Sequence, residues 1–223
     1  MRAIAENLWV LRFPLRLFGT KIGRTVTLIR LRNGELVIHS TAPFTWADVS
    51  LIAGLGKPGW LVDATRLHGT FARQGHAAFP TLPYLAPEGF SRIAGVRTGS
   101  LGAPPAAWSG ELDVLRLEGM PKVQEHVFFH RPSRTLVAAD LIFNFGPDTS
   151  AWTRTFMRCV AGLKCYPGMS RFFRMTIRDR RAFGQSVRTM MEWDFDRVIV
   201  AHGEIIEKDG KRRVAEALAA RGF

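Results

Sequence analysis

Two apolar stretches of this chain each end in one residue that can ionise. Residues 135–139 (Thr-Leu-Val-Ala-Ala) lead to Asp140, and residues 197–201 (Arg-Val-Ile-Val-Ala) lead to His202. A strand that is buried along its length and presents one Asp or His at its carboxyl end can deliver a metal ligand or a catalytic group to the rim of a fold. The two ends together predict one shared site. For each residue alone the alternative is structural, with Asp140 capping a turn and His202 bonded to backbone groups.

The first third of the chain has the alternation and turn signals of a β-meander. Strands are expected at residues 8–13, 25–30, 35–39 and 60–63. Asn33-Gly34 predicts a two-residue hairpin turn before the third of these strands. Thr45 is a predicted N-cap of a helix that continues to Leu55. Residues 65–89, rich in His, Gly and Pro, are expected to form a loop.

The remaining elements alternate between strands and amphipathic helices, with the helices concentrated toward the end. Further strands are expected at residues 111–117, 125–130, 135–139 and 197–201. Helices are expected at residues 152–163, 181–193 and 211–221. The pattern indicates a mixed α and β protein, and no repeat of fixed period is visible.

Composition favours a folded protein of one domain. The chain has 223 residues, of which 47% are hydrophobic, and no charged or low-complexity linker divides it, so a single domain over residues 1–223 is expected. Glu6, Arg12 and Arg16 interrupt the apolar N-terminal residues before any run reaches the ~20 residues of a membrane span. Cys159 and Cys165 match neither a zinc motif nor a redox pair, and the simplest expectation is a cytoplasmic protein with reduced thiols.

The formal charge of +12 is unevenly distributed. Between Ala151 and Met190 there are nine basic residues and one acid, Asp179, so this region carries +8 of the total. Interleaved Phe and Arg suit a single-strand nucleic-acid or membrane surface. Amphipathic helices with their arginines in water explain the same pattern and are favoured here. An anionic small molecule or an acidic partner is therefore expected in preference to nucleic acid, since no nucleic-acid-binding motif accompanies the charge.

The order of elements and strand ends resembles the metallo-β-lactamase-like superfamily. The segments that carry the resemblance are residues 33–40, 63–68, 131–140 and 196–203. Shorter phrases at residues 79–80, 85–89, 129–136 and 141–144, together with His202-Gly203, resemble an uncharacterised bacterial branch of that superfamily. The resemblance implies a four-layer αββα sandwich and a metallo-hydrolase-like protein.

The chain departs from the superfamily's metal-binding motif, a His-x-His-x-Asp-His cluster. If His68 matches the last His of that cluster, Asp63, Thr65 and Leu67 stand at the other ligand positions. Pro121 falls near the place of a further His ligand, so a dinuclear zinc site is not expected. What the resemblance leaves is a mononuclear set of two imidazoles and a carboxylate, His68, Asp140 and His202, for one zinc, iron or manganese ion.

Two functions of different classes follow. In the first, the ion lowers the pKa of a water to about 7 for hydrolysis of an anionic ester, amide or phosphoester, with Asp63 as the proton shuttle and arginines binding the substrate. In the second, the metal site is lost and a basic face between Arg154 and Arg188 makes the protein a binding or scaffold module without a metal. The first is favoured because Asp140 and His202 remain at strand ends.

The other histidines have weaker claims. His126 and His130 lie on one face of a strand and are expected to be packed rather than to bind metal. His39 falls where the superfamily has a strand-end Asp and is expected to hydrogen-bond groups around the ligands. His76 is expected on the surface.

Overall fold

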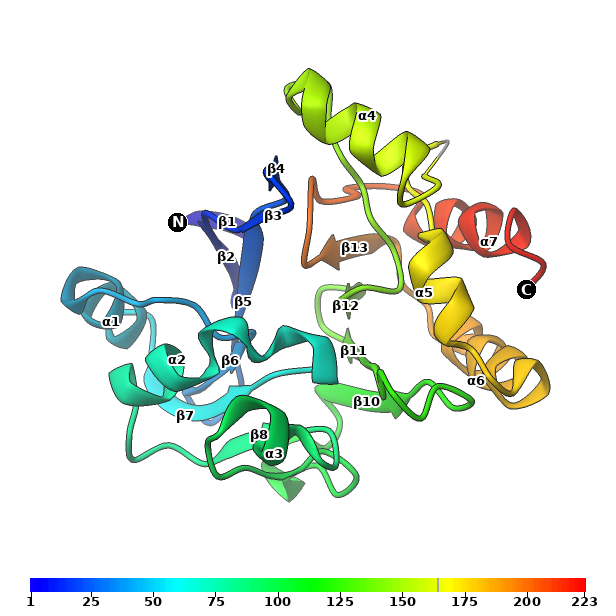
Figure 1. Ribbon diagram of the computed structural model, residues 1–223. Coiled ribbons are helices and arrows are strands. Elements are labelled where there is room, and N and C mark those ends of the chain that lie inside the picture. Colours follow the sequence, from blue (N-terminus) through cyan, green and yellow to red (C-terminus); the bar gives the residue numbers. More distant parts are fainter. Residues whose placement is uncertain (164) are drawn as a thin grey trace.

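The computed structural model describes residues 1–163 and 165–223, which form two β-sheets packed face to face (Figure 1). The first sheet has the order β1-β2-β5-β6-β7-β8-β9 and the second the order β10-β11-β12-β13. The first sheet consists of β1 (Arg2–Ala5), β2 (Leu8–Phe13), β5 (Arg24–Arg30), β6 (Glu35–His39), β7 (Lys57–Val62), β8 (Tyr84–Ala86) and β9 (Gly99–Ser100). The second consists of β10 (Leu112–Arg116), β11 (His126–His130), β12 (Thr135–Ala138) and β13 (Arg197–Val200). A separate two-stranded hairpin, β3 (Arg16–Leu17) and β4 (Thr20–Lys21), stands between β2 and β5.

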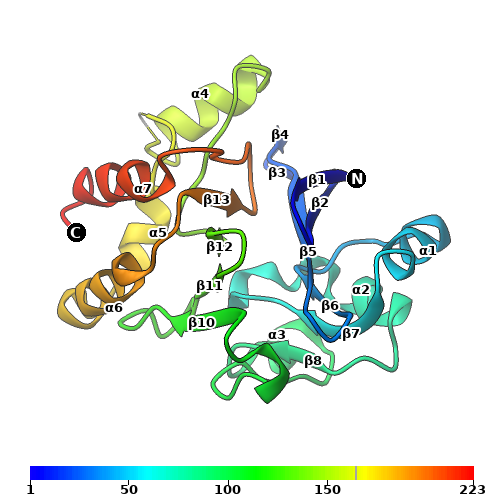
Figure 2. The same ribbon diagram turned by 180° about the vertical axis from the view of Figure 1, so that it is seen from behind.

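Helices cover the outer face of each sheet (Figure 1). The first sheet is covered by α1 (Trp46–Ala53), α2 (Ala72–Ala78) and α3 (Phe90–Ala94), with the 3₁₀ segments η1 (Arg66–Phe71) and η2 (Ala106–Trp108) in the same part of the chain. On the other flank lie α4 (Ala151–Cys159), α5 (Arg171–Thr176), α6 (Arg180–Glu192) and α7 (Gly210–Ala219). Seen from behind, the β3-β4 hairpin again lies beside α4 (Figure 2), and the backbone N–H of Lys21 donates to Thr153 Oγ1 of that helix.

The core between the sheets forms because alternate residues of each strand face opposite ways. Val137 of β12 and Ile199 of β13 contribute to the apolar layer between the sheets, where they join Leu8 and Val62 of the first sheet. Their neighbours Leu136 and Val198 face the second layer of helices. Strands buried on both faces need apolar residues at every position, and this accounts for the unbroken apolar runs before Asp140 and His202.

Most predicted strands and helices are confirmed, with their ends shifted by a few residues. The hairpin before β6 has three linking residues rather than the predicted two, because Leu31 and Glu35 close the loop through a backbone hydrogen bond. Gly34 supplies the one positive φ of that loop, which suits a three-residue turn. Helix α1 begins after the predicted N-cap, where Thr45 and Asp48 form a reciprocal capping box, and ends at Ala53, before the predicted Leu55.

Two regions differ from expectation. Residues 65–89, predicted as a loop, contain η1, α2 and β8, because this segment buries Ala72, Phe79 and Tyr84 in the apolar cluster against the first sheet. Helix α5, which had no prediction, begins at a Ser170 side chain that accepts from the Phe173 N–H.

The expectation that arginines of the basic region face water holds on α6, where Phe183 and Val187 are buried and Arg181 and Arg188 are exposed. Among the described residues no helix is both long and apolar enough to cross a bilayer.

Candidate metal centre

Asp140 and His202 emerge side by side because the strands that carry them are parallel neighbours. β12 pairs with β13 in a register that sets Ala138 opposite Val200. Asp140 and His202 each follow two residues later, so both strand ends present their ionisable group at the same edge of the second sheet. The sequence prediction of a shared edge is thus realised by the register of the two strands.

His68 reaches the same point from the first half of the chain. The segment leading to it is tied to the second sheet by backbone hydrogen bonds from Arg66 N–H to the Val123 carbonyl and from His126 N–H to the Ala64 carbonyl. Thr65 caps η1 through a bond from the Leu67 N–H, and His68 itself leaves helical geometry with φ −92° and ψ 23°. This local kink directs the imidazole toward Asp140.

The three side chains form one group in which the donor atoms lie within 4.8 Å of one another. His68 Nε2 is 3.3 Å from Asp140 Oδ2, and His202 Nε2 is 3.4 Å from Asp140 Oδ1. All three residues are buried, with Asp140 the most accessible at 7% exposure. The structure therefore brings together the three residues that the sequence predicted as a ligand set.

The orientation of His202 is set by two contacts. Its Nδ1 lies 2.6 Å from the Gly23 carbonyl oxygen, and its ring stacks on Phe143 with centroids 5.6 Å apart. A carbonyl can only accept, so Nδ1 carries the proton. In the neutral ring, Nε2 is then an unprotonated lone pair that faces a carboxylate oxygen of Asp140. In that form the two atoms can act as ligands to one cation.

His68 is held in its neutral form by its surroundings. Burial, followed by the nearby charge of Arg24, lowers its pKa to about 4 against the attraction of Asp140. Neither ring nitrogen of His68 has a hydrogen-bond partner among the described residues. A buried imidazole that is neutral and unbonded is a suitable metal ligand.

Asp140 stays ionised although it is buried. Burial by itself would raise the pKa of Asp140, but the attraction of His68 and His202 outweighs this and lowers it well below the usual range. Behind it, the carboxylate of Glu125 accepts the backbone N–H groups of Ala139, Asp140 and Leu141, each at 3.0 Å. These bonds hold the turn after β12 in one conformation and thereby position the Asp140 side chain.

Two further charged groups are buried near the three residues. Arg24 is 1% exposed, and its Nη2 donates to the His68 carbonyl oxygen at 3.4 Å. Burial lowers the pKa of Arg24, and the charges of Asp63 and Asp140 offset part of this effect. The Asp63 carboxylate accepts from the Thr41 N–H, the Thr41 hydroxyl and, at 2.5 Å, the Tyr84 hydroxyl. Burial raises the pKa of Asp63, although Arg24 and these hydrogen bonds counter the rise.

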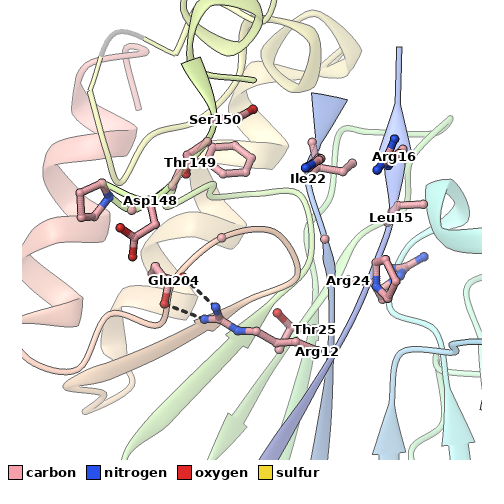
Figure 3. A pocket seen from close by; sticks show the side chains of 17 residues that line it. Arg12, Leu15, Arg16, Ile22, Arg24, Thr25, Asp148, Thr149, Ser150 and Glu204 are labelled. Carbon is pink, nitrogen blue, oxygen red and sulfur yellow. Dashed lines mark hydrogen bonds and ion pairs between the residues drawn. The ribbon is translucent and has the colours of Figure 1, made fainter. Parts of the chain in front are cut away.

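An apolar pocket of about 850 Å³ opens onto His68, Asp140 and His202. Its walls come from the hairpin segment, α4 and α5. The hairpin segment also lines a second, more polar pocket of about 720 Å³ on its other side. Figure 3 shows this polar pocket, where Arg12 reaches Glu204 with bonds of 2.7 and 2.8 Å and Arg24 points away from that pair.

Comparison with solved structures identifies this architecture. A metallo-β-lactamase from Pontibacter korlensis matches 99% of this chain and 97% of its own with a TM-score of 0.66 and 13% identity. One from Erythrobacter litoralis, with β-mercaptoethanol in its active site, matches 98% of this chain and 95% of its own, with a TM-score of 0.66 and 16% identity. This chain has the metallo-β-lactamase fold. The αββα sandwich expected from the resemblance is confirmed.

The likeness is one of fold, because identity with these metallo-β-lactamase structures is low. FIM-1 from Pseudomonas aeruginosa, solved in its mono-zinc form, matches 99% of this chain and 95% of its own with a TM-score of 0.63 and 12% identity. No protein-family model matches the sequence, and no curated protein matches it significantly.

Where the metallo-β-lactamase resemblance left ligand positions without His, the structure gives most of the substitutes other roles. Thr65 caps η1 and Asp63 is bonded to Thr41 and Tyr84, while Leu67 is 54% exposed and lines the apolar pocket. Among the described residues, His68, Asp140 and His202 are the one group of three or more potential ligands that converges.

The remaining histidines lie apart from this group. His126 and His130 are buried at the ends of β11, where they contact the Gln124 carbonyl oxygen at 3.1 Å and the Ser133 hydroxyl at 2.7 Å. His39 packs edge-on against Phe128, and its nitrogens find no hydrogen-bond partner in the described part of the chain, contrary to the expected bonding around the ligands. His76 is also corrected: it is half-buried on α2 and stacks on Tyr84 rather than lying free on the surface.

Three contributors to the site were missed by sequence reasoning. Gly23 acts through its backbone carbonyl, which leaves no trace in residue type. Arg24 opens a strand and resembles any of the many arginines of this basic chain. Glu125 could have been found from the sequence. It directly precedes the strand with the apolar residues 127–129, and a carboxylate buried at such a position needs hydrogen-bond donors.

Proposed function

We propose that this protein is a metal-dependent hydrolase with a mononuclear site formed by His68, Asp140 and His202. The observation that carries the proposal is a pair of short distances: His68 Nε2 lies 3.3 Å from Asp140 Oδ2, and His202 Nε2 lies 3.4 Å from Asp140 Oδ1. Two ligand atoms about 2.1 Å from one zinc ion at a tetrahedral angle lie about 3.4 Å apart. Each imidazole Nε2 therefore has ligand spacing from one Asp140 oxygen, and the donor atoms of all three residues lie within 4.8 Å of one another.

The donor set suits this role chemically. Two imidazoles and one carboxylate are ligands for zinc, iron or manganese, and three protein ligands leave a position open, as catalytic sites require. An ion held there would act as a Lewis acid and supply an activated water at neutral pH. A single-ion site has precedent in the fold, since FIM-1 is described in a mono-zinc form.

The chain's own residues would provide the rest of the site. The apolar walls exclude water and so strengthen the electrostatic interactions within the pocket. Arg24 supplies a fixed positive charge, which favours a substrate with an anionic ester, amide or phosphoester group. Asp63, whose pKa is raised by burial, is the group proposed to hold and transfer a proton.

A second candidate is a binding module that has lost its metal. The exposed arginines Arg154 and Arg158 on α4 and Arg181 and Arg188 on α6 favour it, because their positive charge suits an acidic partner. This candidate predicts that the protein holds no metal. It is weaker because Asp140, His68 and His202 line one pocket rather than pointing apart or being sealed off by Phe143.

Metal content measured by mass spectrometry tests the proposal. Untagged protein purified without chelator, and the variants His68→Ala, Asp140→Ala and His202→Ala, would be compared with His76→Ala, a half-buried histidine outside the site. We expect about one equivalent of zinc, iron or manganese in the wild type and in the control, with loss of metal in the three folded variants. Protein that stays without metal after reconstitution would exclude the hydrolase and favour the binding module.

A further inference from the structure

The apolar pocket at the metal centre has two chemically distinct ends. Its inner end is formed by His68, Asp140, His202 and Arg24. The rest of its wall is almost wholly apolar and includes Leu15, Leu17, Phe18, Phe156, Val160 and Phe172. A volume of about 850 Å³ lies within the ~300–1,000 Å³ of pockets that enclose a drug-sized ligand. The shape of this lining predicts a ligand with one polar end and a large apolar body.

The apolar wall continues to the surface around the pocket. Eleven large apolar side chains are exposed among the described residues, and five of them line this pocket: Leu17, Phe18, Leu67, Val160 and Phe172. Single exposed apolar residues are ordinary on a protein surface, but a concentration around one opening marks a binding surface. Phe18 is the most exposed of the five at 74%, and its ring stacks on Phe156 across the pocket from β3-β4 to α4.

The charge of the lining selects the sign of the polar end. The acid in the lining is Asp140, whereas two arginines, Arg16 and Arg24, contribute positive charge. Arg24 is 1% exposed, and its Nε and Nη1 have no hydrogen-bond partner in the part of the chain that the structure describes. A buried guanidinium with free N–H groups can donate hydrogen bonds to a carboxylate or phosphate.

We propose that the pocket binds an anionic amphiphile, with an alkyl or acyl chain against the walls formed by β3-β4, α4 and α5. The acidic head, or the bond next to it, then lies at the His68–Asp140–His202 end under the charge of Arg24. This inference deepens the proposed function by naming its substrate class. It rests on that function for the reaction, whereas binding of the amphiphile itself requires no metal.

Calorimetric binding of alkyl carboxylates to the full chain, in the presence of chelator, tests the inference. Octanoate, decanoate and dodecanoate would be compared below their micelle concentrations, with dodecyltrimethylammonium as a probe of the same chain length and opposite charge. Each buried methylene group should tighten binding about three- to fourfold, so Kd should fall on the order of 100-fold from octanoate to dodecanoate. The cationic probe should bind at least about tenfold more weakly than dodecanoate, because the positive charges of the lining repel it.

Surface variants separate the pocket from nonspecific binding. Phe172→Asp, at a side chain 49% exposed in the pocket wall, should weaken dodecanoate binding by about tenfold or more. Its control is Ile93→Asp, a side chain 55% exposed on α3 and outside the lining, which should bind like the wild type. Arg16→Glu should weaken dodecanoate binding. Arg92→Glu makes the same charge change outside the pocket lining and should bind dodecanoate like the wild type.

Several results would overturn the inference. These are a Kd independent of chain length, equal binding of the cationic probe, or equal losses in the pocket variants and their controls. Because chelator is present, none of these outcomes depends on the metal. A protein that binds one metal ion but shows no preference for dodecanoate would overturn the substrate class and leave the hydrolase proposal standing. A protein that prefers dodecanoate but binds no metal ion would support the proposed ligand class and exclude the metal site.

Discussion

The carboxylate of Glu125 accepts a 3.0 Å hydrogen bond from the backbone N–H of Asp140, and the N–H groups on either side of Asp140 donate to the same carboxylate. Glu125 is fully buried at the start of the second sheet's central hairpin. Burial, followed by repulsion from Asp140, raises its pKa to about 8, while the three N–H donors oppose the rise. One buried acid thus fixes the backbone from which the proposed metal ligand projects.

Glu125→Gln is therefore expected to disturb the site without touching a ligand. A glutamine keeps one acceptor oxygen and replaces the other with an NH₂ group that meets a backbone N–H, so one buried donor loses its partner. We expect a loss of about 1–3 kcal/mol in the free energy of unfolding and a roughly 10- to 100-fold loss of metal affinity. Urea denaturation and metal titration measure the two effects, with the exposed Glu6→Gln as control. Unchanged metal affinity would mean that Glu125 supports the fold alone.

Buried histidines predict a loss of stability in acid. Burial lowers the pKa of His39 to about 3 and the pKa values of His126 and His130 to about 4. The unfolded chain, with histidine pKa near 6.5, then binds more protons than the folded chain between about pH 6.5 and 4. The stability contribution of these histidines is therefore full above about pH 6.5 and falls as the pH decreases, by up to about 3 kcal/mol for His126 or His130 and about 5 kcal/mol for His39.

His130 offers the clearest test of this acid sensitivity. Asn can place a polar atom near the position of Nδ1, which contacts the Ser133 hydroxyl, and Asn does not titrate. The free energy of unfolding, measured with urea in chelator at pH 7.5, 6 and 5, should fall less steeply with acid in His130→Asn than in the wild type. Parallel curves for the two proteins would show that His130 does not contribute to the effect.

The parts of the site that sequence could predict are those whose residue types must follow a pattern. Asp140 and His202 interrupt apolar runs at the carboxyl ends of strands that are buried on both faces, and the middle of such a strand does not tolerate a charge. The fold followed from the same runs and from the resemblance in element order. The helices within residues 65–89 were missed because Gly and Pro there mark short connections between small elements rather than one loop.

The parts that could not be predicted depend on distances between segments far apart in the chain. The Gly23 carbonyl meets His202 across 179 positions, and its role does not depend on a side chain. Arg24 becomes distinctive only when the fold buries it beside Asp63 and Asp140. The sequence has 31 Lys and Arg residues, and residue type alone does not distinguish Arg24 from the others.

The ion pair between Arg12 and Glu204 should contribute little to stability, although its geometry is good. It joins β2 to the turn after β13 through two hydrogen bonds of 2.7 and 2.8 Å, and both side chains are nearly half exposed. Exposed pairs of this kind contribute about 0.2–1 kcal/mol. Glu204→Gln should therefore lower the free energy of unfolding by no more than about 1 kcal/mol and less at high salt. A larger, salt-independent loss would show that Glu204 has a packing role in the polar pocket.

Asp63 is the residue whose proposed role can be separated most sharply from that of the ligands. Its carboxylate is bonded to Thr41 and Tyr84 and lies outside the group formed by His68, Asp140 and His202. If Asp63 transfers a proton, Asp63→Asn should keep its metal and lose about 10²–10⁴-fold in hydrolysis of a substrate that the wild type accepts. Metal content, the rate and its pH profile are the measurements.

Tyr84→Phe supplies the matched control for Asp63. It removes the 2.5 Å hydrogen bond to the carboxylate but leaves the carboxylate itself. Loss of that donor should raise the pKa of Asp63 further, because the bond favours the ionised form. The basic group in a proton transfer would then titrate at higher pH, and the rate profile of Tyr84→Phe should shift upward while its maximum is largely kept. If Asp63→Asn hydrolyses at the wild-type rate with metal bound, or if the Tyr84→Phe profile does not shift, Asp63 supports the loop before η1 and takes no part in proton transfer.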